Sequence, residues 1–301
     1  MDSEHSQYGT LYLSATPIGN LEDMTYRSVR ILSEADLIAA EDTRHTRKLL
    51  AHYDIHTRLT SYHEHNKLAK GPELIGYLLS GKNLVCVSDA GLPGIADPGS
   101  HLAQLAIEAG IRVTPLPGAN AALSALICSG LDTTMFSFIG FLPKTGKKRM
   151  ELLEQIRCRK DTLIFYEAPH HLRQTLQDLA SILGEGRKAA AARELTKHYE
   201  EFRRDRLGGL CAWYQEHEPR GEFVLIVEGD TGETGAAKDM LPQDPVEIYE
   251  AFLSRNVEKK EAMRRTAKQL GISRRDVYRI LLKKESGEQG SKAGKDISER
   301  E

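Results

Sequence analysis

The segment Val87-Ser88-Asp89-Ala90-Gly91-Leu92-Pro93-Gly94-Ile95-Ala96-Asp97-Pro98-Gly99-Ser100 connects a short apolar run to a stretch with helical apolar spacing. It is long for a connection, since an ordinary loop needs only about 4–6 residues. In an open α/β sheet, strand-to-helix loops lie at the carboxyl ends of the strands, where ligands bind. The three glycines and two prolines set turns and let a ligand approach the main chain. We therefore interpret this segment as a pocket wall rather than an ordinary surface loop.

The composition is that of a globular chain with room for more than one domain. The 301 residues are 40% hydrophobic and 28% charged, and the formal net charge of −2 indicates no particular partner. Residues 1–9 are polar and no run of about 18 apolar residues occurs, so we expect a cytoplasmic protein without a membrane partner. The four cysteines lack metal-ligand spacing, so we expect reduced thiols and no metal.

Predicted strands alternate with helices over residues 1–117, which is typical of an α/β lobe. Strands are expected at 10–13, 36–40, 58–62, 84–87 and from 113 to the prolines that follow. The glycine-containing loop at 15–21 lacks the glycine patterns of dinucleotide sites and of P-loops. The sequence therefore does not support a dinucleotide or a nucleoside triphosphate as ligand.

The pattern begins again over residues 118–231 and predicts a second α/β lobe. Asn120 opens an apolar helix that ends near Gly130. Strands are expected at 135–143, 162–166, 189–192 and 222–229, and the basic segment 145–149 leads into a helix.

Charged side chains gather where predicted strands end, at 41–45, 167–171 and 193–198. In the first group Asp42 or Thr43 suits the N-cap of the next helix, and a place in a binding site is an equal interpretation. His63 and His65 have no third ligand nearby, so we interpret them as solvated or capping rather than metal-binding.

The carboxyl-terminal part differs from the rest in charge. Residues 232–245 read as a linker, and 246–285 as three helices with a helix-turn-helix pattern in which Ser273 caps the third. Over 254–284, eleven Lys and Arg stand against three acidic residues. Such a basic helical domain on an acidic body is typical of nucleic-acid binding, although a solvated helical appendage is the competing interpretation. Residues 286–301 are expected to be disordered.

Taken together and in order, these motifs resemble the RsmI type of small-subunit ribosomal RNA methyltransferase in the tetrapyrrole-methylase superfamily. They span almost all of residues 10–229, and any one alone would be weak. The matching pieces are Thr16-Pro17-Ile18-Gly19-Asn20-Leu21-Glu22-Asp23, Glu41-Asp42-Thr43-Arg44, Ser88-Asp89-Ala90-Gly91, Asp97-Pro98-Gly99, Pro117-Gly118-Ala119-Asn120, Gly140-Phe141-Leu142-Pro143, Tyr166-Glu167-Ala168-Pro169-His170, Arg193-Glu194-Leu195-Thr196-Lys197 and Gly221-Glu222-Phe223.

The resemblance implies two α/β lobes of the class III methyltransferase type, with S-adenosylmethionine in the cleft between them, plus a small helical carboxyl-terminal domain. It implies a homodimer that methylates the ribose 2′-oxygen of a cytidine, cytidine 1402 of the decoding centre, in the 16S ribosomal RNA of the small subunit. Carried over by motif, the cofactor wall comprises Pro17, Gly19, Asp89, Ala90, Gly91, Pro93, Ile95, Asn120, Ala121, Phe141 and Leu142. One departure is Leu92, where the family commonly has a small polar residue. If its side chain enters the pocket, a hydrogen bond to the cofactor is lost.

Activation of a ribose hydroxyl requires a general base, or stabilisation of the emerging alkoxide. Candidates for the base or an orienting acceptor are Asp42, Glu167 and Glu194. Candidates for phosphate or alkoxide partners are Arg44, Arg193 and Lys197, although pairs such as Arg44 with Asp42 also suit structural ion pairs. Further from the pocket, we expect Lys147, Lys148, Arg149 and the basic carboxyl-terminal domain to hold RNA phosphates.

Two other functions fit parts of the sequence. A methyltransferase of the same fold could take a tetrapyrrole carbon or a modified histidine, as in diphthine, as acceptor, although the basic appendage and the 167–170 motif argue against it. A ligand-sensing regulator could bind nucleic acid through its helix-turn-helix without catalysis, in which case we expect tight duplex binding and no turnover.

Overall fold

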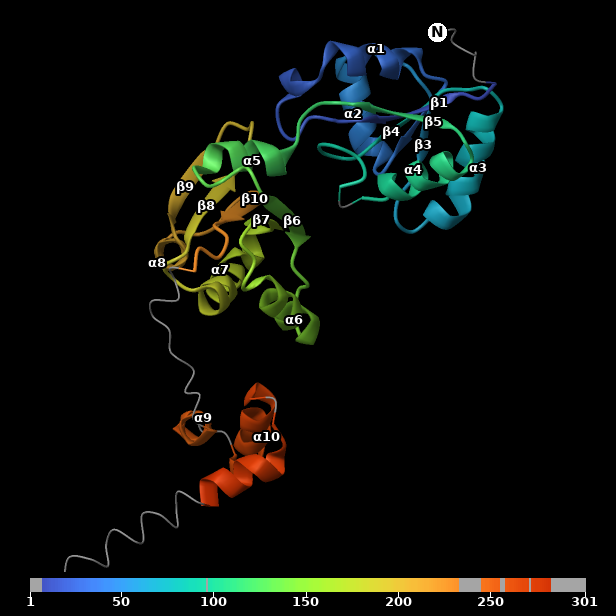
Figure 1. Ribbon diagram of the computed structural model, residues 1–301. Coiled ribbons are helices and arrows are strands. Elements are labelled where there is room, and N and C mark those ends of the chain that lie inside the picture. The colour runs from blue at the N-terminus through green and yellow to red at the C-terminus, as the bar shows by residue number, and fades with distance from the viewer. Residues whose placement is uncertain (1–6, 96, 233–244, 255–257, 271, 283–301) are drawn as a thin grey trace, which may run out of the picture. The chain divides into compact units, whose positions relative to one another are not determined.

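The computed structural model describes residues 7–95, 97–232, 245–254, 258–270 and 272–282. By internal contacts the chain divides into two compact units, Met1–Thr231 and Gly232–Glu301. The larger unit holds two five-stranded sheets, each covered by helices (Figure 1). This confirms the expected pair of α/β lobes.

The first sheet is parallel throughout, with strand order β3-β2-β4-β1-β5. Its strands are β1 (Thr10–Ser14), β2 (Leu37–Ala40), β3 (Leu59–Ser61), β4 (Leu84–Val87) and β5 (Arg112–Leu116). Its helical elements are η1 (Leu21–Asp23), α1 (Tyr26–Glu34), α2 (Thr43–His52), α3 (Lys67–Leu79) and α4 (Gly99–Glu108). All four residues of β4 are buried because helices cover both faces of this central strand. Its carboxyl end, where the segment 88–100 begins, therefore lies in the middle of the sheet.

The second sheet has strand order β6-β7-β10-β8-β9, and only the β6–β7 pair is parallel. Its strands are β6 (Phe136–Phe141), β7 (Thr162–Glu167), β8 (Lys188–Arg193), β9 (Glu201–Arg206) and β10 (Phe223–Val227). Its helices are α5 (Ala121–Ser129), α6 (Lys147–Ile156), α7 (Pro169–Leu183) and α8 (Leu207–Glu216).

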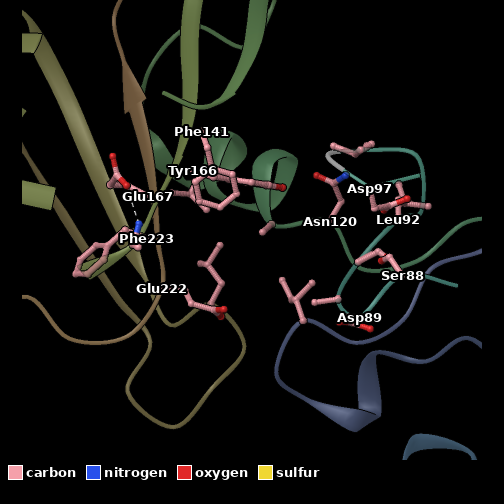
Figure 2. Close-up of a pocket in the computed structure, with 18 of the residues that line it drawn as sticks. Ser88, Asp89, Leu92, Asp97, Asn120, Phe141, Tyr166, Glu167, Glu222 and Phe223 are labelled. Carbon is pink, nitrogen blue, oxygen red and sulfur yellow. Dashed lines mark hydrogen bonds between the residues drawn. The ribbon is translucent and has the colours of Figure 1, made fainter. Parts of the chain in front are cut away.

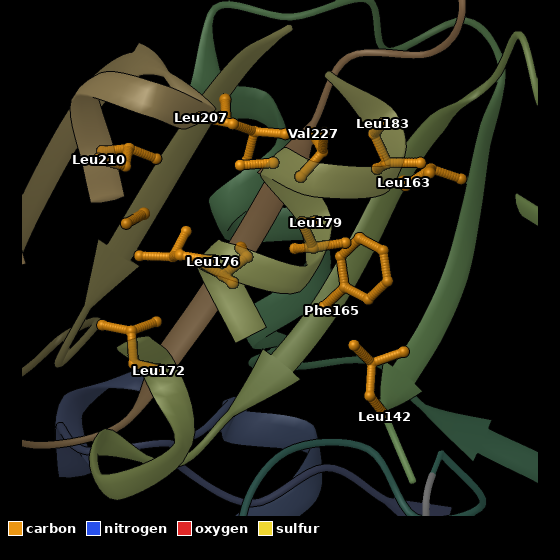
Figure 3. Packing of buried hydrophobic residues seen from close by; sticks show 14 of the residues in the cluster. Leu142, Leu163, Phe165, Leu172, Leu176, Leu179, Leu183, Leu207, Leu210 and Val227 are labelled. Atoms are coloured by element: carbon orange, nitrogen blue, oxygen red, sulfur yellow. The ribbon is translucent and has the colours of Figure 1, made fainter. Parts of the chain in front are cut away.

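The two faces of the second sheet bury different clusters. Alternate residues such as Leu163 and Phe165 pack against α6, α7 and α8, as Figure 3 shows for Leu172, Leu176 and Leu179. The intervening residues of the strands, Ile164 among them, pack against α5 on the opposite face. Burial on both faces explains why β7 and β10 read as continuous apolar runs in the sequence.

Strand β9 and helix α8 were not predicted from the sequence. Charged residues predominate in β9, which pairs only along one side with β8 at the edge of the sheet, so its side chains reach solvent. Gly208 and Gly209 in the first turn of α8 lower its helix propensity. Helix α8 forms because Leu207, Leu210 and Tyr214 enter the core of the second sheet, and β9 forms by pairing with β8, with Phe202 packed on the opposite face.

The smaller unit contains α9 (Pro245–Ser254), α10 (Lys259–Leu270) and helical residues 274–282. The predicted cap is confirmed, since the Asp276 amide donates to Ser273 Oγ at 3.2 Å and the Ser273 hydroxyl donates to Asp276 Oδ2 at 2.6 Å. Most of the expected linker, at 233–244, and the expected tail at 286–301 lie outside the described residues. Within the described ranges, no helix is long and apolar enough to cross a membrane.

Candidate active site

A pocket of about 490 Å³ lies in the larger unit and takes residues from both sheets. Figure 2 shows the labelled side chains of the first lobe and of α5's amino end on one side, and those of β6, β7 and β10 opposite. The first group lining the pocket comprises Ile18, Glu41, Ser88, Asp89, Ala90, Gly91, Leu92, Ile95, Asp97, Asn120 and Ala121. The second comprises Phe141, Tyr166, Glu167, Ala168, Pro169, Leu195, Lys197, Glu222, Phe223 and Val224. The strand-end loops therefore converge, as expected, on one cavity.

The loop after β4 is fastened to the loop after β1. Thr16 and Gly91 exchange two backbone hydrogen bonds of 3.0 Å, and the Thr16 hydroxyl donates to the Ser88 carbonyl at 3.1 Å. Gly91 has a φ of +82°, and a Cβ there would lie 3.4 Å from the Ile18 side chain. Glycine thus permits both the left-handed backbone and the close approach of the two loops.

Asp97 holds the turn of the same loop. One carboxylate oxygen, Oδ1, accepts the amides of Gly94 and Gly99, both at 2.7 Å. Burial raises the pKa of Asp97, the two amide hydrogen bonds oppose this, and the nearby Asp89 charge adds to the rise, so the net shift is upward. The carboxylate therefore shapes the pocket wall and adds negative charge to it.

Two more acidic residues stand at neighbouring strand ends. Asp89 Oδ1 accepts the backbone amide of Asp42 at 2.9 Å, which ties the end of β2 to the end of β4. Glu41 is half-buried, and burial together with the charges of Asp89 and Asp97 raises its pKa, while His63 opposes the rise. This side of the pocket therefore carries three carboxyl groups.

Aromatic rings form part of the opposite wall. Tyr166 at the end of β7 makes edge-on contacts with Phe138 and Phe141 of β6, with ring centroids 5.0 and 5.6 Å apart. Burial raises the pKa of the Tyr166 hydroxyl, and a smaller hydrogen-bond contribution opposes it. With Leu195 and Phe223, these rings give the second lobe a largely apolar surface toward the cavity.

Lys197 joins two carboxylates at the edge of the pocket. Its Nζ donates to Glu194 Oε1 at 2.9 Å and to Glu222 Oε2 at 2.8 Å. Burial disfavours the charged forms of Lys197 and Glu194, but their hydrogen bonds outweigh this effect. The pKa of Lys197 is therefore raised and that of Glu194 is lowered. A Cβ at Gly19 would lie 2.4 Å from Lys197 Cγ, so glycine lets the first loop rest against this lysine.

Glu167 is buried and fully engaged. Its Oε2 accepts the Thr175 hydroxyl at 2.5 Å, and its Oε1 accepts the Ala168 amide at 2.9 Å. Thr175 in turn accepts a hydrogen bond from Arg149, which also binds Asp178 at 2.8 Å. Arg149 is only 7% exposed, so the expectation that it holds RNA phosphates is wrong: a guanidinium committed to a buried network cannot reach a phosphate. Lys147 and Lys148 remain exposed in the first turn of α6.

Comparison with known proteins places this geometry in a family. Residues 10–211 match the model for tetrapyrrole (corrin/porphyrin) methylases. A protein of Halalkalibacterium halodurans called ribosomal RNA small subunit methyltransferase I is 52% identical over 90% of this chain and 94% of its own length. The protein of the same name from Bacillus subtilis is 47% identical over 91% and 94%. The chain belongs to the tetrapyrrole methylase family, in its ribosomal RNA small subunit methyltransferase I branch.

Solved structures of tetrapyrrole methylases share the fold. The uroporphyrin-III-C-methyltransferase of Thermus thermophilus covers 76% of this chain and 98% of its own, with a TM-score of 0.52 and 22% identity. Diphthine synthase covers 74% and 90%, with a TM-score of 0.57 and 15% identity. These more distant likenesses show the class III fold alone, and it is the relatives at 47–52% identity that make this chain a methyltransferase.

Seven of the residues expected in the tetrapyrrole methylase cofactor wall line the pocket: Asp89, Ala90, Gly91, Ile95, Asn120, Ala121 and Phe141. Leu92 also lines it, so the side chain that departs from the family pattern faces the cavity (Figure 2). Pro17, Gly19, Pro93 and Leu142 are not among the lining residues. Leu142 packs in the core of the second sheet, and its part in cofactor binding, like that of the others, stays a prediction.

The residues expected to take part in catalysis are dispersed. Asp42 caps α2 by accepting the Arg44 amide at 2.8 Å, and the exposed Arg44 guanidinium lies 3.7 Å from it. Arg193 pairs with Glu201 of β9 at 3.3 Å, and Glu194 binds Lys197. Of the five residues expected to be catalytic, only Glu167 lines the pocket. Lys197, which was expected as a phosphate or alkoxide partner, also lines it. The catalytic roles of all of them remain predictions.

Several pocket residues were not singled out from the sequence as site residues, among them Glu41, Asp97, Tyr166 and Glu222. Each belongs to a motif quoted for the resemblance, and Glu41 and Tyr166 stand at or directly after the last residues of β2 and β7. The signal was therefore present, but the neighbours Asp42 and Glu167 carry equally polar side chains. Asp42 caps α2 and does not line the pocket, whereas Glu167 lines it together with Tyr166.

Proposed function

We propose that this methyltransferase transfers a methyl group from S-adenosylmethionine to the ribose 2′-oxygen of a cytidine in small-subunit ribosomal RNA, by resemblance cytidine 1402. The observation that carries the proposal is the cavity of about 490 Å³ lined by both lobes, in a chain that is 52% identical over 90% of its length to a ribosomal RNA small subunit methyltransferase I.

The lining residues suit S-adenosylmethionine. The volume lies in the range of about 300–1,000 Å³ typical of small-molecule sites. Leu92, Ile95 and Ala121 offer an apolar surface for an adenine ring. Glu41, Asp89 and Asp97 offer negative charge for the sulfonium and the amino group of the ligand.

S-adenosylmethionine supplies, when bound, an electrophilic methyl group on a positively charged sulfur. The chain holds the donor in a rigid wall, since Asp97 and the Thr16–Gly91 pair fix the loop after β4. The apolar wall of Leu195, Phe141 and Phe223 limits water at the site. Such positioning can provide several kcal/mol of the barrier reduction, because the acceptor must lie about 3–3.5 Å from the reacting carbon.

The smaller unit is proposed to hold RNA phosphates. Lys259, Lys260, Arg274 and Arg275 are exposed on its helices. Arg264 and Arg265 instead hydrogen-bond to Glu261, and those bonds lower the pKa of Glu261 to about 2. The exposed group therefore offers cations for the sequence-independent part of RNA affinity.

We further propose that the chain forms a homodimer in the cytoplasm, where small subunits are made. The second lobe exposes apolar side chains on the α5 side of its sheet: Ile127 of α5 is 72% exposed, Leu123 45% and Phe136 of the edge strand β6 43%. Exposed apolar side chains on one face are typical of a protein interface. A second copy of the chain is the proposed partner for this face.

The test is methyl transfer from labelled S-adenosylmethionine to small ribosomal subunits that lack the native modification, with the product mapped by mass spectrometry. We expect a single ribose-methylated cytidine, and no transfer to subunits that already carry the modification. Calorimetric binding of the donor without any transfer would overturn the proposed acceptor and favour a tetrapyrrole or histidine acceptor, or a regulator.

A further inference from the structure

The carboxylates that line the pocket differ in what already binds them. Asp89 accepts the Asp42 amide, and Asp97 accepts the amides of Gly94 and Gly99. Glu167 accepts Thr175 and Ala168, and Glu222 accepts Lys197. Among the residues that the structure describes, Glu41 is the pocket carboxylate with no hydrogen-bond or ion-pair partner. Its lone pairs are therefore free for a ligand.

The surroundings of Glu41 suit a proton acceptor. It directly follows the last residue of β2, which pairs with the central strand β4, so Glu41 is attached to the end of the sheet. The charged or titratable groups that act on it are Asp89, Asp97, Glu64 and His63. His63 Nδ1 is buried without a hydrogen-bond partner in the described part of the chain.

We infer that Glu41 is the general base that takes the proton from the acceptor hydroxyl, an inference that rests on the proposed ribose methylation. The hydroxyl oxygen forms its bond to the methyl carbon while the carbon–sulfur bond breaks and its electron pair passes to sulfur. The hydroxyl proton passes to a Glu41 carboxylate oxygen, and Glu41 then releases that proton to water. The donor becomes a neutral thioether, so atoms and charges balance.

The other carboxylates are less suited to this step. Protonation of Glu167 would weaken its short hydrogen bond from Thr175, and protonation of Glu222 would remove the charge that pairs with Lys197. Asp97 binds both amides through Oδ1, so a proton on its other oxygen would neutralise the charge that strengthens the two hydrogen bonds holding the loop. Each of these carboxylates, like Asp89 with its Asp42 amide, would therefore weaken a charge-assisted hydrogen bond on taking up a proton. Glu41 accepts a proton without such a loss, and its raised pKa brings it closer to neutral pH.

The experiment compares single-turnover methyl transfer at saturating donor over a range of pH for the full-length protein and three variants. For wild type we expect the rate to rise with pH and reach a plateau. For Glu41→Gln we expect a plateau about 10²–10⁴-fold lower and no rise with pH. Glu41→Asp should retain the rise at a reduced rate, because a carboxylate is still present. Glu64→Gln is the control: it removes a neighbouring charge outside the pocket and should keep the wild-type plateau.

The outcomes separate the two proposals. A Glu41→Gln protein that methylates ribose at a rate within about threefold of wild type, with the same pH profile, overturns the role of Glu41 and leaves the proposed function standing. A wild-type protein that methylates another acceptor overturns the proposed function, and the base assignment falls with it. Calorimetric binding of S-adenosylmethionine to Glu41→Gln shows that the variant is folded.

Discussion

At the scale of single residues, two side chains that are adjacent in the sequence can have different roles at the pocket. Glu41 lines the cavity while Asp42, the next residue, caps α2 and ties its backbone to Asp89. Glu194 similarly turns away from the strand with a φ of +50°, so that its carboxylate reaches Lys197 and the Glu222 amide. The backbone therefore decides which of several adjacent polar side chains serves the site.

Gly221 is one residue on which this arrangement depends. It has a φ of +80°, and a Cβ there would lie 2.4 Å from Glu194 Cγ. We expect Gly221→Ala to lower the free energy of unfolding by at least about 2 kcal/mol, from backbone strain plus displacement of Glu194. Gly130→Ala is the control, since its φ is +79° with no atom within 4 Å, and it should cost only about 1 kcal/mol. Equal losses in denaturant unfolding would contradict the contact with Glu194.

Glu41 should also affect stability. Its folded-state pKa is raised, so folding favours the protonated form, and stability falls as pH rises from the ordinary glutamate value through the raised one. Above that window the ionised carboxylate destabilises the fold. We therefore expect Glu41→Gln to have a higher Tm than wild type at neutral pH and no advantage below the ordinary value. Thermal unfolding at both pH values, with Glu64→Gln as comparison, measures this; an unchanged Tm at neutral pH would count against the buried carboxylate.

At the scale of elements, α6 and α7 are joined by the buried Arg149 network. We expect Arg149→Met to lower the free energy of unfolding by about 3 kcal/mol, because Asp178 and Thr175 lose their partner in a buried site. Lys148→Met, one residue earlier on the exposed side of the helix, should change stability by less than about 0.5 kcal/mol but weaken RNA binding. Chemical unfolding and RNA titration together check the pair. Comparable stability for the two variants would refute the structural role of Arg149.

The elements also show what the sequence could and could not predict. Strands such as β4 and β7 were predicted because both faces are buried and the residues are continuously apolar. The charged edge strand β9 and the glycine-containing α8 carry neither pattern and form only by packing on the sheet. At the site, the motifs predicted which loops converge and left the helix cap at Asp42 as one of two interpretations, but they did not predict that Glu41 lines the pocket. The strand end itself was predicted correctly, but adjacent acidic residues carry the same motif signal, and only the folded backbone determines which of them faces the cavity.

At the scale of the whole molecule, the smaller unit supplies exposed cations that take no part in the pocket. We expect Arg274→Gln with Arg275→Gln to weaken RNA affinity while donor binding is unchanged. If each arginine contacts a phosphate, the slope of log affinity against log salt should fall by about 0.7 per arginine removed. Arg30→Gln, which breaks an exposed pair with Glu34 in the other unit, is the control. Binding measured at several salt concentrations decides the matter, and an unaltered slope would exclude these two arginines from the RNA contact.

The acidic wall formed by Glu41, Asp89 and Asp97 bears on turnover as well as on binding. Under the proposed chemistry, the donor arrives as a cation at sulfur and leaves without that charge, while the wall is the same before and after. The reaction therefore removes the electrostatic attraction that favours binding of the donor. The product therefore binds the acidic wall less strongly than the next donor does, which favours its replacement after each turnover.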